Sequence, residues 1–149
     1  MSNNDIGIDL GTSNIVITMG NKGVVLSEPS VIAYNTRTER VLAVGKEAYE
    51  MIGRNPDYIC VSRPVSDGVI SDDDLAKSMI REFIIKISGH QLLKPRIIIC
   101  VPAFVTDIES RAIVDAAKFA GARQVYLIQE PVAAMIGAEV DIAKAKGHM

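Results

Sequence analysis

The stretch Asp5–Asn14, DIGIDLGTSN, decides how the rest of the chain is interpreted. Apolar residues alternate with Gly7 and Asp9, which is the period of a half-buried strand, and a second apolar run starts directly after Asn14. A strand, a short polar turn and another strand predict a β-hairpin. The turn holds Gly11, two hydroxyls and an amide, so its backbone can approach a bulky anion and cradle phosphate oxygens.

The carboxylate of Asp9 lies two residues before this glycine and would repel a phosphate unless a cation lay between them. This arrangement indicates Mg²⁺, held through water. The alternative is an ordinary hairpin in which Asp9 only stabilises the turn, and the motif taken alone favours that alternative. The rest of the chain has to decide between the two interpretations.

Length and composition are those of one soluble globular domain. The chain has 149 residues, of which 48% are hydrophobic and 23% charged, which fits a domain with its own core. Its net charge is −2 and its basic residues are scattered, so it has no electrostatic signature for binding nucleic acid. No apolar run could span a membrane and no signal peptide is recognisable, so we expect a cytoplasmic location. We expect Cys100, inside an apolar run, to be a buried reduced thiol.

The first half of the chain predicts an antiparallel meander followed by a small insertion. The two strands of the hairpin are followed by a third over Val24–Leu26, and Pro29 ends it or places it at an edge. From Ala33 to Ser66 the pattern weakens. The signals there are two strand-like pieces and one short helix, at Val41–Val44, Tyr58–Ser62 and Lys46–Ile52. We interpret residues 33–66 as a small inserted subdomain with little core of its own, and residues 1–32 and 67–149 as one large subdomain.

The second half alternates helices and strands. Ser71, followed by three aspartates, predicts a capped helix start, and the helix presents one apolar stripe: Leu75, Met79, Ile80, Phe83, Ile84 and Ile87. The apolar run Arg96–Val101 predicts a strand covered on both faces. Thr106 and Glu109 then form a capping box, and Gly121 suits a left-handed helix end. The apolar stripe of that helix is predicted as Ile108, Ala112, Ile113, Ala116 and Phe119 or Ala120.

A short strand over Val125–Ile128 and a helix with Pro131 in its first turn complete the pattern. The order β-β-β, insertion, α-β-α-β-α predicts an α/β fold of the ribonuclease H-like class, a five-stranded mixed sheet with flanking helices. The first strand should lie near the middle of the sheet. Its turn and the C-terminal ends of the last two strands should then open into one crevice.

Several segments, in this order, resemble the actin-like ATPase superfamily and most closely its MreB family of bacterial cell-shape actins. IDLGTSN resembles the first phosphate loop of that family, and LSEPSVIA resembles its third-strand signature. VGKEAYEMIGR and RPVSDGVISD resemble the small subdomain and the return from it. The stretch from PRIIICVPAF to QEPVAAMIGA resembles the second half of the first large subdomain, so the resemblance covers Asp5–Gly137.

The resemblance implies ATP and Mg²⁺ as cofactors. In this family reading, Asp9 holds Mg²⁺ through water, and Gly11, Thr12, Ser13 and Asn14 wrap the β- and γ-phosphates. Phosphoryl transfer asks a protein mainly for such positioning and charge neutralisation, and for an aligned water.

The resemblance also assigns residues outside the hairpin. Glu130 matches the catalytic acid that orients the attacking water, and its alternative role is to stabilise the start of the helix at Pro131. Gln129 stands where many MreB sequences have a second glutamate. Asp67 would point toward the nucleotide cleft, and the equally weighted alternative is a turn-forming aspartate before Gly68.

Leu92 and Leu93 match the position of an apolar loop through which MreB filaments bind membrane. Lysine and arginine beside them would meet anionic headgroups. Two leucines bury too little apolar surface to hold a monomer, so binding would depend on the many copies in a filament. The alternative is that these leucines only close over the end of the preceding helix.

The function implied by the resemblance is that of the N-terminal lobe of an MreB-like ATPase. Such a protein would assemble with itself into filaments at the inner face of the cell membrane and organise cell shape with the cell-wall elongation machinery. The family continues into a DIGGGT-type phosphate loop and a second lobe beyond the position of Met149. We therefore expect ATP hydrolysis by the full-length protein and negligible hydrolysis by these 149 residues.

Two other functions compete with this one. The first is a non-catalytic, single-lobe module that binds a protein partner or itself and holds no nucleotide. The second is a lobe of a sugar kinase or a heat-shock-type chaperone, against which stand the segments EPSVIA and VSDGVI.

Overall fold

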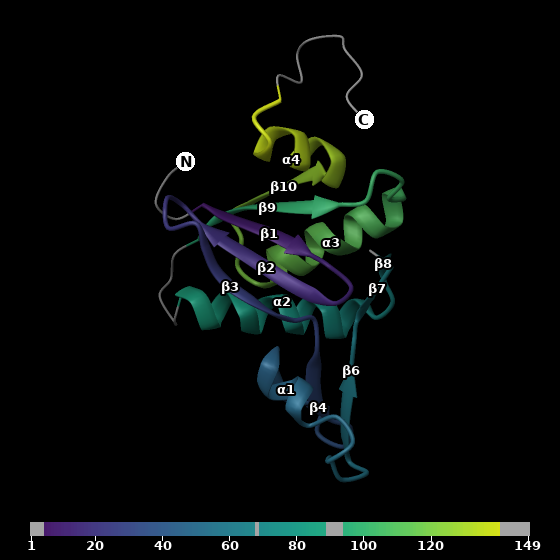
Figure 1. The fold of residues 1–149 in the computed structure, drawn as a ribbon. Helices are drawn as coiled ribbons and strands as arrows, with labels where there is room; N and C mark the ends of the chain where they lie inside the picture. The colour runs from purple at the N-terminus through teal and green to yellow at the C-terminus, as the bar shows by residue number, and fades with distance from the viewer. Residues whose placement is uncertain (1–4, 68, 89–93, 141–149) are drawn as a thin grey trace.

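The computed structural model describes residues 5–67, 69–88 and 94–140 (Figure 1). Its body is a five-stranded mixed sheet in the order β10-β9-β1-β2-β3. The strands are β1 (Ile6–Leu10), β2 (Asn14–Met19), β3 (Val24–Pro29), β9 (Arg96–Val101) and β10 (Gln124–Gln129). β1 pairs antiparallel with β2 and parallel with β9, which confirms the predicted hairpin and the central place of the first strand.

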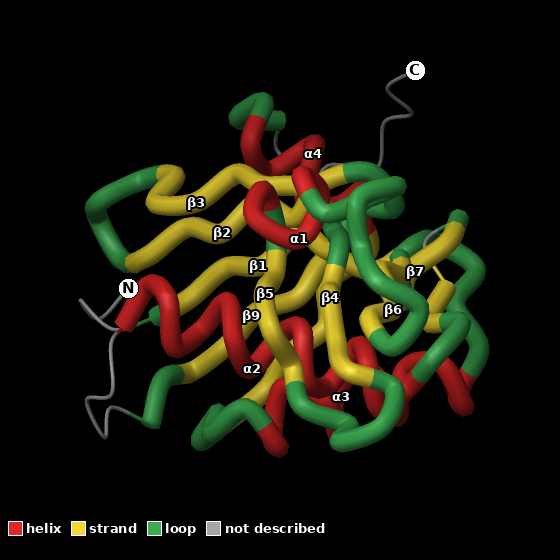
Figure 2. Tube along the Cα trace, turned by 90° about the horizontal axis from the view of Figure 1, so that it is seen from below, coloured by secondary structure: helices red, strands yellow, loops and turns green. Residues whose placement is uncertain are grey.

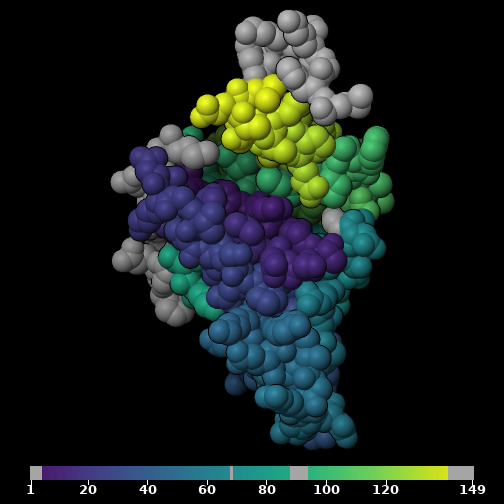
Figure 3. Space-filling view, viewed as in Figure 1, coloured from purple at the N-terminus to yellow at the C-terminus, as the bar shows by residue number. Residues whose placement is uncertain are grey.

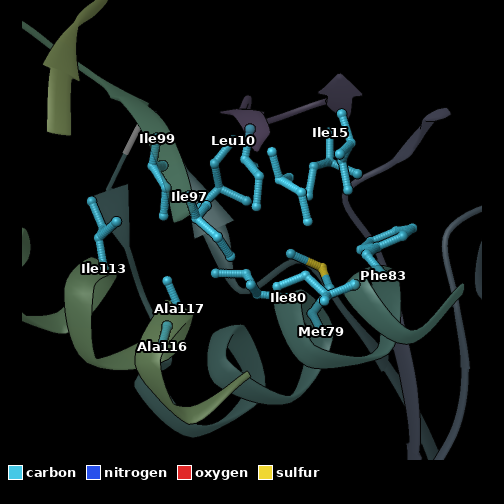
Figure 4. Packing of buried hydrophobic residues seen from close by; sticks show 14 of the residues in the cluster. Leu10, Ile15, Met79, Ile80, Phe83, Ile97, Ile99, Ile113, Ala116 and Ala117 are labelled. Atoms are coloured by element: carbon cyan, nitrogen blue, oxygen red, sulfur yellow. The ribbon is translucent and has the colours of Figure 1, made fainter. Parts of the chain in front are cut away.

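Helices α2 (Asp73–Ser88) and α3 (Asp107–Phe119) cover one face of this sheet, and the main core lies between them and the strands (Figure 4). Every second residue of β1 and β9 points into this core, including Ile8 and Ile99, which are almost completely buried. Phe83 of α2 is fully buried there, which is worth about 1.5–3 kcal/mol relative to an exposed ring. The apolar stripe predicted for α2 is therefore confirmed.

The start of α2 differs from the prediction of a Ser71 cap. Asp72 caps the helix instead: its Oδ1 accepts a hydrogen bond of 2.9 Å from the backbone N–H of Leu75. Its carbonyl oxygen accepts a second bond of 2.9 Å from the N–H of Ala76. A carboxylate suits this place better than a hydroxyl, because its charge also interacts with the positive end of the helix.

The capping box of α3 is confirmed, but its apolar stripe is partly wrong. Thr106 and Glu109 exchange hydrogen bonds of 2.8 and 3.3 Å, and Gly121 ends the helix with a φ of 101°. Ile108 is 82% exposed, because it lies in the first turn, directly after the loop that leaves the sheet. Phe119 is 60% exposed. The fully or almost fully buried residues of α3 are Ile113, Ala116 and Ala117.

The second face of the sheet is covered less completely, by α4 (Glu130–Gly137), which lies beside the β10 edge (Figure 1). On β9, Ile97, Ile99 and Val101 are buried, whereas the residues between them are half-buried. The predicted cover on both faces of this strand is therefore complete on the helix face and only partial on the other. Cys100 belongs to the half-buried set and is a free thiol, so it is reduced as expected but less buried.

A second, three-stranded sheet projects from the body, in the order β5-β4-β6 (Figures 2 and 3). It consists of β4 (Ile32–Asn35), β5 (Val41–Val44) and β6 (Ile59–Ser62), with the short helix α1 (Lys46–Glu50) packed on it. The sequence predicted β5, β6 and the start of α1, but not β4. Its own core is small and centres on Val31, Ala33 and Ala48. We call these elements the small unit, and the boundary at residues 33–66 stays a prediction.

The chain returns from the small unit through a short hairpin of β7 (Val65–Ser66) and β8 (Val69–Ile70). This hairpin leads directly into α2. In the part of the chain that the structure describes, no helix is long and apolar enough to cross a membrane.

Candidate functional site

The loop between β1 and β2, residues 11–13, lies at the C-terminal end of the central strand. It is tight: a Cβ atom added to Gly11 would lie 2.7 Å from the carbonyl oxygen of Asn14. Any residue other than glycine would therefore press its Cβ against the backbone of Asn14, and one of the two must shift. Thr12 is half-buried, whereas Ser13 and Asn14 are exposed, so two of the residues predicted to bind phosphate are open to solvent.

Two residues from outside the hairpin hold the backbone of this loop. Ser30 Oγ donates to the carbonyl oxygen of Gly11 at 2.7 Å, and the Ser30 N–H donates to that of Ser13 at 3.0 Å. Arg63 Nη1 donates to the carbonyl oxygens of Ser13 at 3.2 Å and Thr12 at 3.5 Å. The loop is thus shaped by bonds to its carbonyl groups.

Asp9 and Glu130 approach each other across the neighbouring strands. In the sheet register Asp9 pairs with Cys100 on β9, and Cys100 pairs with Ile128 on β10, two residues before Glu130. The side chain of Asp9 lies on the face opposite α2 and α3, because its neighbours along β1 are buried against those helices. Both carboxylates are exposed, so both are available to a ligand.

The charges of both carboxylates affect the pKa of the Cys100 thiol. Burial raises its pKa above the ordinary value, and the negative charges of Asp9 and then Glu130 raise it further. A thiolate is disfavoured there, so Cys100 is a poor nucleophile at neutral pH. Two exposed carboxylates therefore lie beside a backbone loop that suits an anion, a combination that needs a cation to be occupied by phosphate.

The start of α4 places Glu130 in the first helical turn, with Pro131 directly after it. The helix-stabilising role of this carboxylate is thus realised, and it does not conflict with a role in chemistry. Gln129 Nε2 donates to the carbonyl oxygen of Ala103 at 3.3 Å, which ties the end of β10 to the loop before α3. A glutamate at this position could not donate that bond.

The remaining predicted residues are Asp67, Leu92 and Leu93. Asp67 is exposed in the turn between β7 and β8, and its φ of 53° is the left-handed conformation that aspartate tolerates in turns. Its turn role is confirmed, whereas its role in a nucleotide cleft stays a prediction. Leu92 and Leu93 lie outside the described residues.

Sequence reasoning missed Ser30 and Arg63. Both lie in segments that carried the family resemblance, LSEPSVIA and RPVSDGVISD. No periodicity or spacing in the sequence connects either residue to the loop at residues 11–13. The contacts form because the segment that enters the small unit and the segment that leaves it both pass beside the hairpin. Among the described residues, no group of three or more histidine, cysteine or acidic side chains could hold a metal ion.

Comparison with known sequences gives one family and two groups of relatives. A family model described as MreB/Mbl protein matches residues 3–149. The cell shape-determining protein Mbl of Bacillus subtilis is 47% identical over 146 residues, which cover 97% of this chain and 44% of Mbl. The cell shape-determining protein MreB of Escherichia coli is 43% identical over 155 residues, which cover 100% of this chain and 45% of MreB. The chain thus spans less than half the length of these relatives.

Solved structures of the same family superpose on the chain. The structure of MreB5 of Spiroplasma citri bound to ADP has a TM-score of 0.82 and 34% sequence identity, over 96% of this chain and 43% of MreB5. The structure of the same protein bound to AMPPNP has a TM-score of 0.83 and 32% identity, over 99% and 45%. The fold is therefore the actin-like one that the resemblance predicted. The alternative of a non-catalytic, single-lobe assembly or protein-binding module is not favoured.

Proposed function

Because the chain belongs to the MreB/Mbl family, we propose that it forms the N-terminal lobe of a cell shape-determining, actin-like ATPase. The relatives that match it are cell shape-determining proteins, and MreB5 has been solved with ADP and with AMPPNP. The observation that carries the proposal is the placement of Asp9 and Glu130 at the C-terminal ends of β1 and β10, on either side of β9 and beside the loop of residues 11–13. These two carboxylates are 121 residues apart in sequence (130 − 9).

The residues present fit a nucleotide with Mg²⁺. Asp9 offers one exposed carboxylate, which suits an ion that keeps most of its water and takes further ligands from phosphate. When bound, Mg²⁺ would neutralise charge on the β- and γ-phosphates. Residues 11–14 would bind phosphate oxygens through backbone N–H groups and the hydroxyls of Thr12 and Ser13.

Glu130 would orient the attacking water and accept its proton. Its exposure leaves room for water beside the carboxylate, and its position at the end of β10 is fixed by the parallel pairing with β9. A carboxylate in this role raises the rate by positioning a water molecule and by general base catalysis.

The test is phosphate release by the full-length protein with Mg·ATP. Glu130→Ala and Glu130→Gln should each lower the rate by about 100-fold or more, with the affinity for Mg·AMPPNP changed little. Asp107→Asn is the matched control, because Asp107 is also an exposed carboxylate in the first turn of a helix. Phosphate release unchanged in Glu130→Ala would refute the catalytic role and leave only the helix-stabilising one.

The 149-residue chain by itself should bind ATP very weakly, because one lobe supplies only one wall of a nucleotide cleft. Calorimetry with Mg·ATP on this chain and on the full-length protein measures the difference. Micromolar affinity of the chain alone would contradict this expectation.

We also propose that the full-length protein assembles with itself into filaments at the inner face of the cell membrane and acts there with the cell-wall elongation machinery. Leu92 and Leu93 are proposed to contact the membrane, on the basis of the sequence alone. Replacing both by serine should reduce the pelleting of filaments with liposomes that contain anionic lipid. Leu42→Ser is the control, since Leu42 is a leucine of the small unit that is 48% exposed. If the unsubstituted protein, the double serine variant and Leu42→Ser pellet equally, these leucines do not contact the membrane and only close over the end of the preceding helix.

A further inference from the structure

Both segments that connect the small unit to the body bind the phosphate loop proposed above, residues 11–13. Ser30 lies in the segment that enters the small unit, between β3 and β4, and is fully buried. Arg63 lies in the segment that leaves it, between β6 and β7, and is exposed. Together they donate four hydrogen bonds to the three carbonyl groups of the loop, at 2.7, 3.0, 3.2 and 3.5 Å.

These bonds determine which way the amide groups of the loop point. In a planar trans peptide, a carbonyl and the N–H of the next residue point in opposite directions. The carbonyls of Gly11, Thr12 and Ser13 are directed toward Ser30 and Arg63, so the N–H groups of Thr12, Ser13 and Asn14 are directed away from them. Those N–H groups are the ones proposed to meet phosphate. Ser30 and Arg63 therefore control the loop's capacity to bind an anion.

Arg63 has a second contact, on the small unit itself. Its guanidinium carbon lies 5.8 Å from the centre of the Tyr49 ring, within cation–π range, and Tyr49 is the fourth residue of α1. The guanidinium thus bridges the carbonyls of the loop and the face of a ring on α1. Ser30 makes no such bridge, because its bonds are directed to the loop alone.

The other end of α1 is anchored to the body. Glu28 of β3 accepts a hydrogen bond of 3.1 Å from the backbone N–H of Lys46, the first residue of α1, and forms an ion pair of 2.7 Å with Lys86 of α2. The start of α1 is therefore held by the body, whereas Tyr49 meets the body through Arg63. A change in the loop that moves the guanidinium therefore acts on α1 at Tyr49, away from the helix start that Glu28 holds.

We propose that Arg63 is a positioning residue that couples the phosphate loop to α1, so that anion binding at residues 11–13 changes the stability of the small unit. This inference rests on the proposed nucleotide site. It assigns to Arg63 no contact with the reacting atoms. A nucleoside di- or triphosphate is the ligand class, and the small unit is the element that responds.

The experiment combines nucleotide affinity with amide hydrogen exchange in the full-length protein, with and without Mg·AMPPNP. In the unsubstituted protein, nucleotide should slow exchange both in the loop and in α1. Arg63→Ala should weaken Mg·AMPPNP binding by about tenfold, the loss of one charge-assisted hydrogen-bonded contact, and should abolish the protection of α1. Arg63→Lys keeps the charge but not the planar fork, so it should restore part of both effects.

Two further variants separate coupling from general damage. Tyr49→Ala should leave the affinity for Mg·AMPPNP unchanged and abolish the protection of α1. It removes the contact between Arg63 and α1 but keeps the hydrogen bonds from Arg63 to the loop. Arg37→Ala is the matched control: Arg37 belongs to the small unit and lies 5.4 Å from the centre of the Tyr58 ring, but donates no bond to the loop. It should behave like the unsubstituted protein in both measurements.

The outcomes also distinguish this inference from the proposed function. If the unsubstituted protein binds no Mg·AMPPNP, the proposed nucleotide site is wrong, and the coupling that depends on it falls as well. If it binds nucleotide but Arg63→Ala binds equally well and still protects α1, the nucleotide site stands and the coupling is wrong.

Discussion

Replacing Gly11 by alanine tests the geometry of the loop more directly than any change of a charged residue. The new methyl carbon would lie 2.7 Å from the carbonyl oxygen of Asn14 and 3.8 Å from its carbonyl carbon. Ordinary contact begins at about 3.5 Å, so the backbone on one side of the loop must move. The colliding atom belongs to backbone and cannot rotate away as the end of a side chain would.

The expected cost follows from two opposing effects. Forcing an extra methyl into a packed place costs about 1–3 kcal/mol, and alanine regains about 0.4–1 kcal/mol because it restricts the unfolded chain. The net result is a loss of stability of about 1–2 kcal/mol. Because the loop moves away from its bonds with Ser30 and Arg63, nucleotide affinity of the full-length protein should fall in the same variant.

The assay is urea unfolding of the chain, followed by circular dichroism, with Gly137→Ala as the matched control. An added Cβ at Gly137 meets nothing within 4 Å, and Gly137 lies in α4 without a positive φ. Alanine there should raise stability by about 0.4–1 kcal/mol, so the two substitutions are expected to have opposite signs. If Gly11→Ala is as stable as Gly137→Ala, the tight loop and the argument built on its carbonyls are wrong.

Three further predictions use the same chain. Thr106→Ala removes the hydroxyl of the capping box and should lower the free energy of unfolding by about 1 kcal/mol, measured by urea unfolding. Ile113→Ala should cost about 2–5 kcal/mol, whereas Ile108→Ala should cost less than about 0.5 kcal/mol, because only the first side chain is buried. Alkylation of Cys100 at pH 7, with the other cysteine replaced by alanine, should be slower than that of a free thiol and should become faster in Asp9→Asn, because removing that charge lowers the thiol's pKa. An unchanged alkylation rate in Asp9→Asn would mean that the carboxylate does not act on the thiol.

Local patterns predicted most of the elements because their causes lie within a few residues of one another. The alternation in β1, the stripe of α2 and the capping box at Thr106 each depend on contacts one to four positions apart, and each is present in the structure. β4 escaped prediction because its four residues lie between the end of β3 and a turn, too short a stretch for alternation to stand out. Ile108 fits the helical spacing, but only the sheet's boundary decides that the first turn of α3 lies outside the core.

The chemical residues of the site were predicted, and so was the convergence of the first turn with the C-terminal ends of the last two strands; the relation to Cys100 and the contacts of Ser30 and Arg63 were not. Asp9, Glu130 and residues 11–14 were all named from the sequence, largely through the family resemblance of their segments. That Asp9 and Glu130 both act on Cys100 depends on the parallel pairing of three strands. Ser30 and Arg63 hold the loop because the two segments that connect the small unit to the body both pass beside it. Leu92 and Leu93 remain a prediction from sequence.

By itself, the sequence determined the kinds of element, their order and the family, because hydrophobic period, capping residues and ordered motifs are local properties of the chain. Only the tertiary structure decided which residues become neighbours: the two carboxylates around Cys100, the clamp of Ser30 and Arg63 on the loop, and the exposure of Ile108. The physical reason is that these contacts join residues tens of positions apart. Their geometry follows from strand register and from the packing of whole elements, which no local pattern in the sequence encodes.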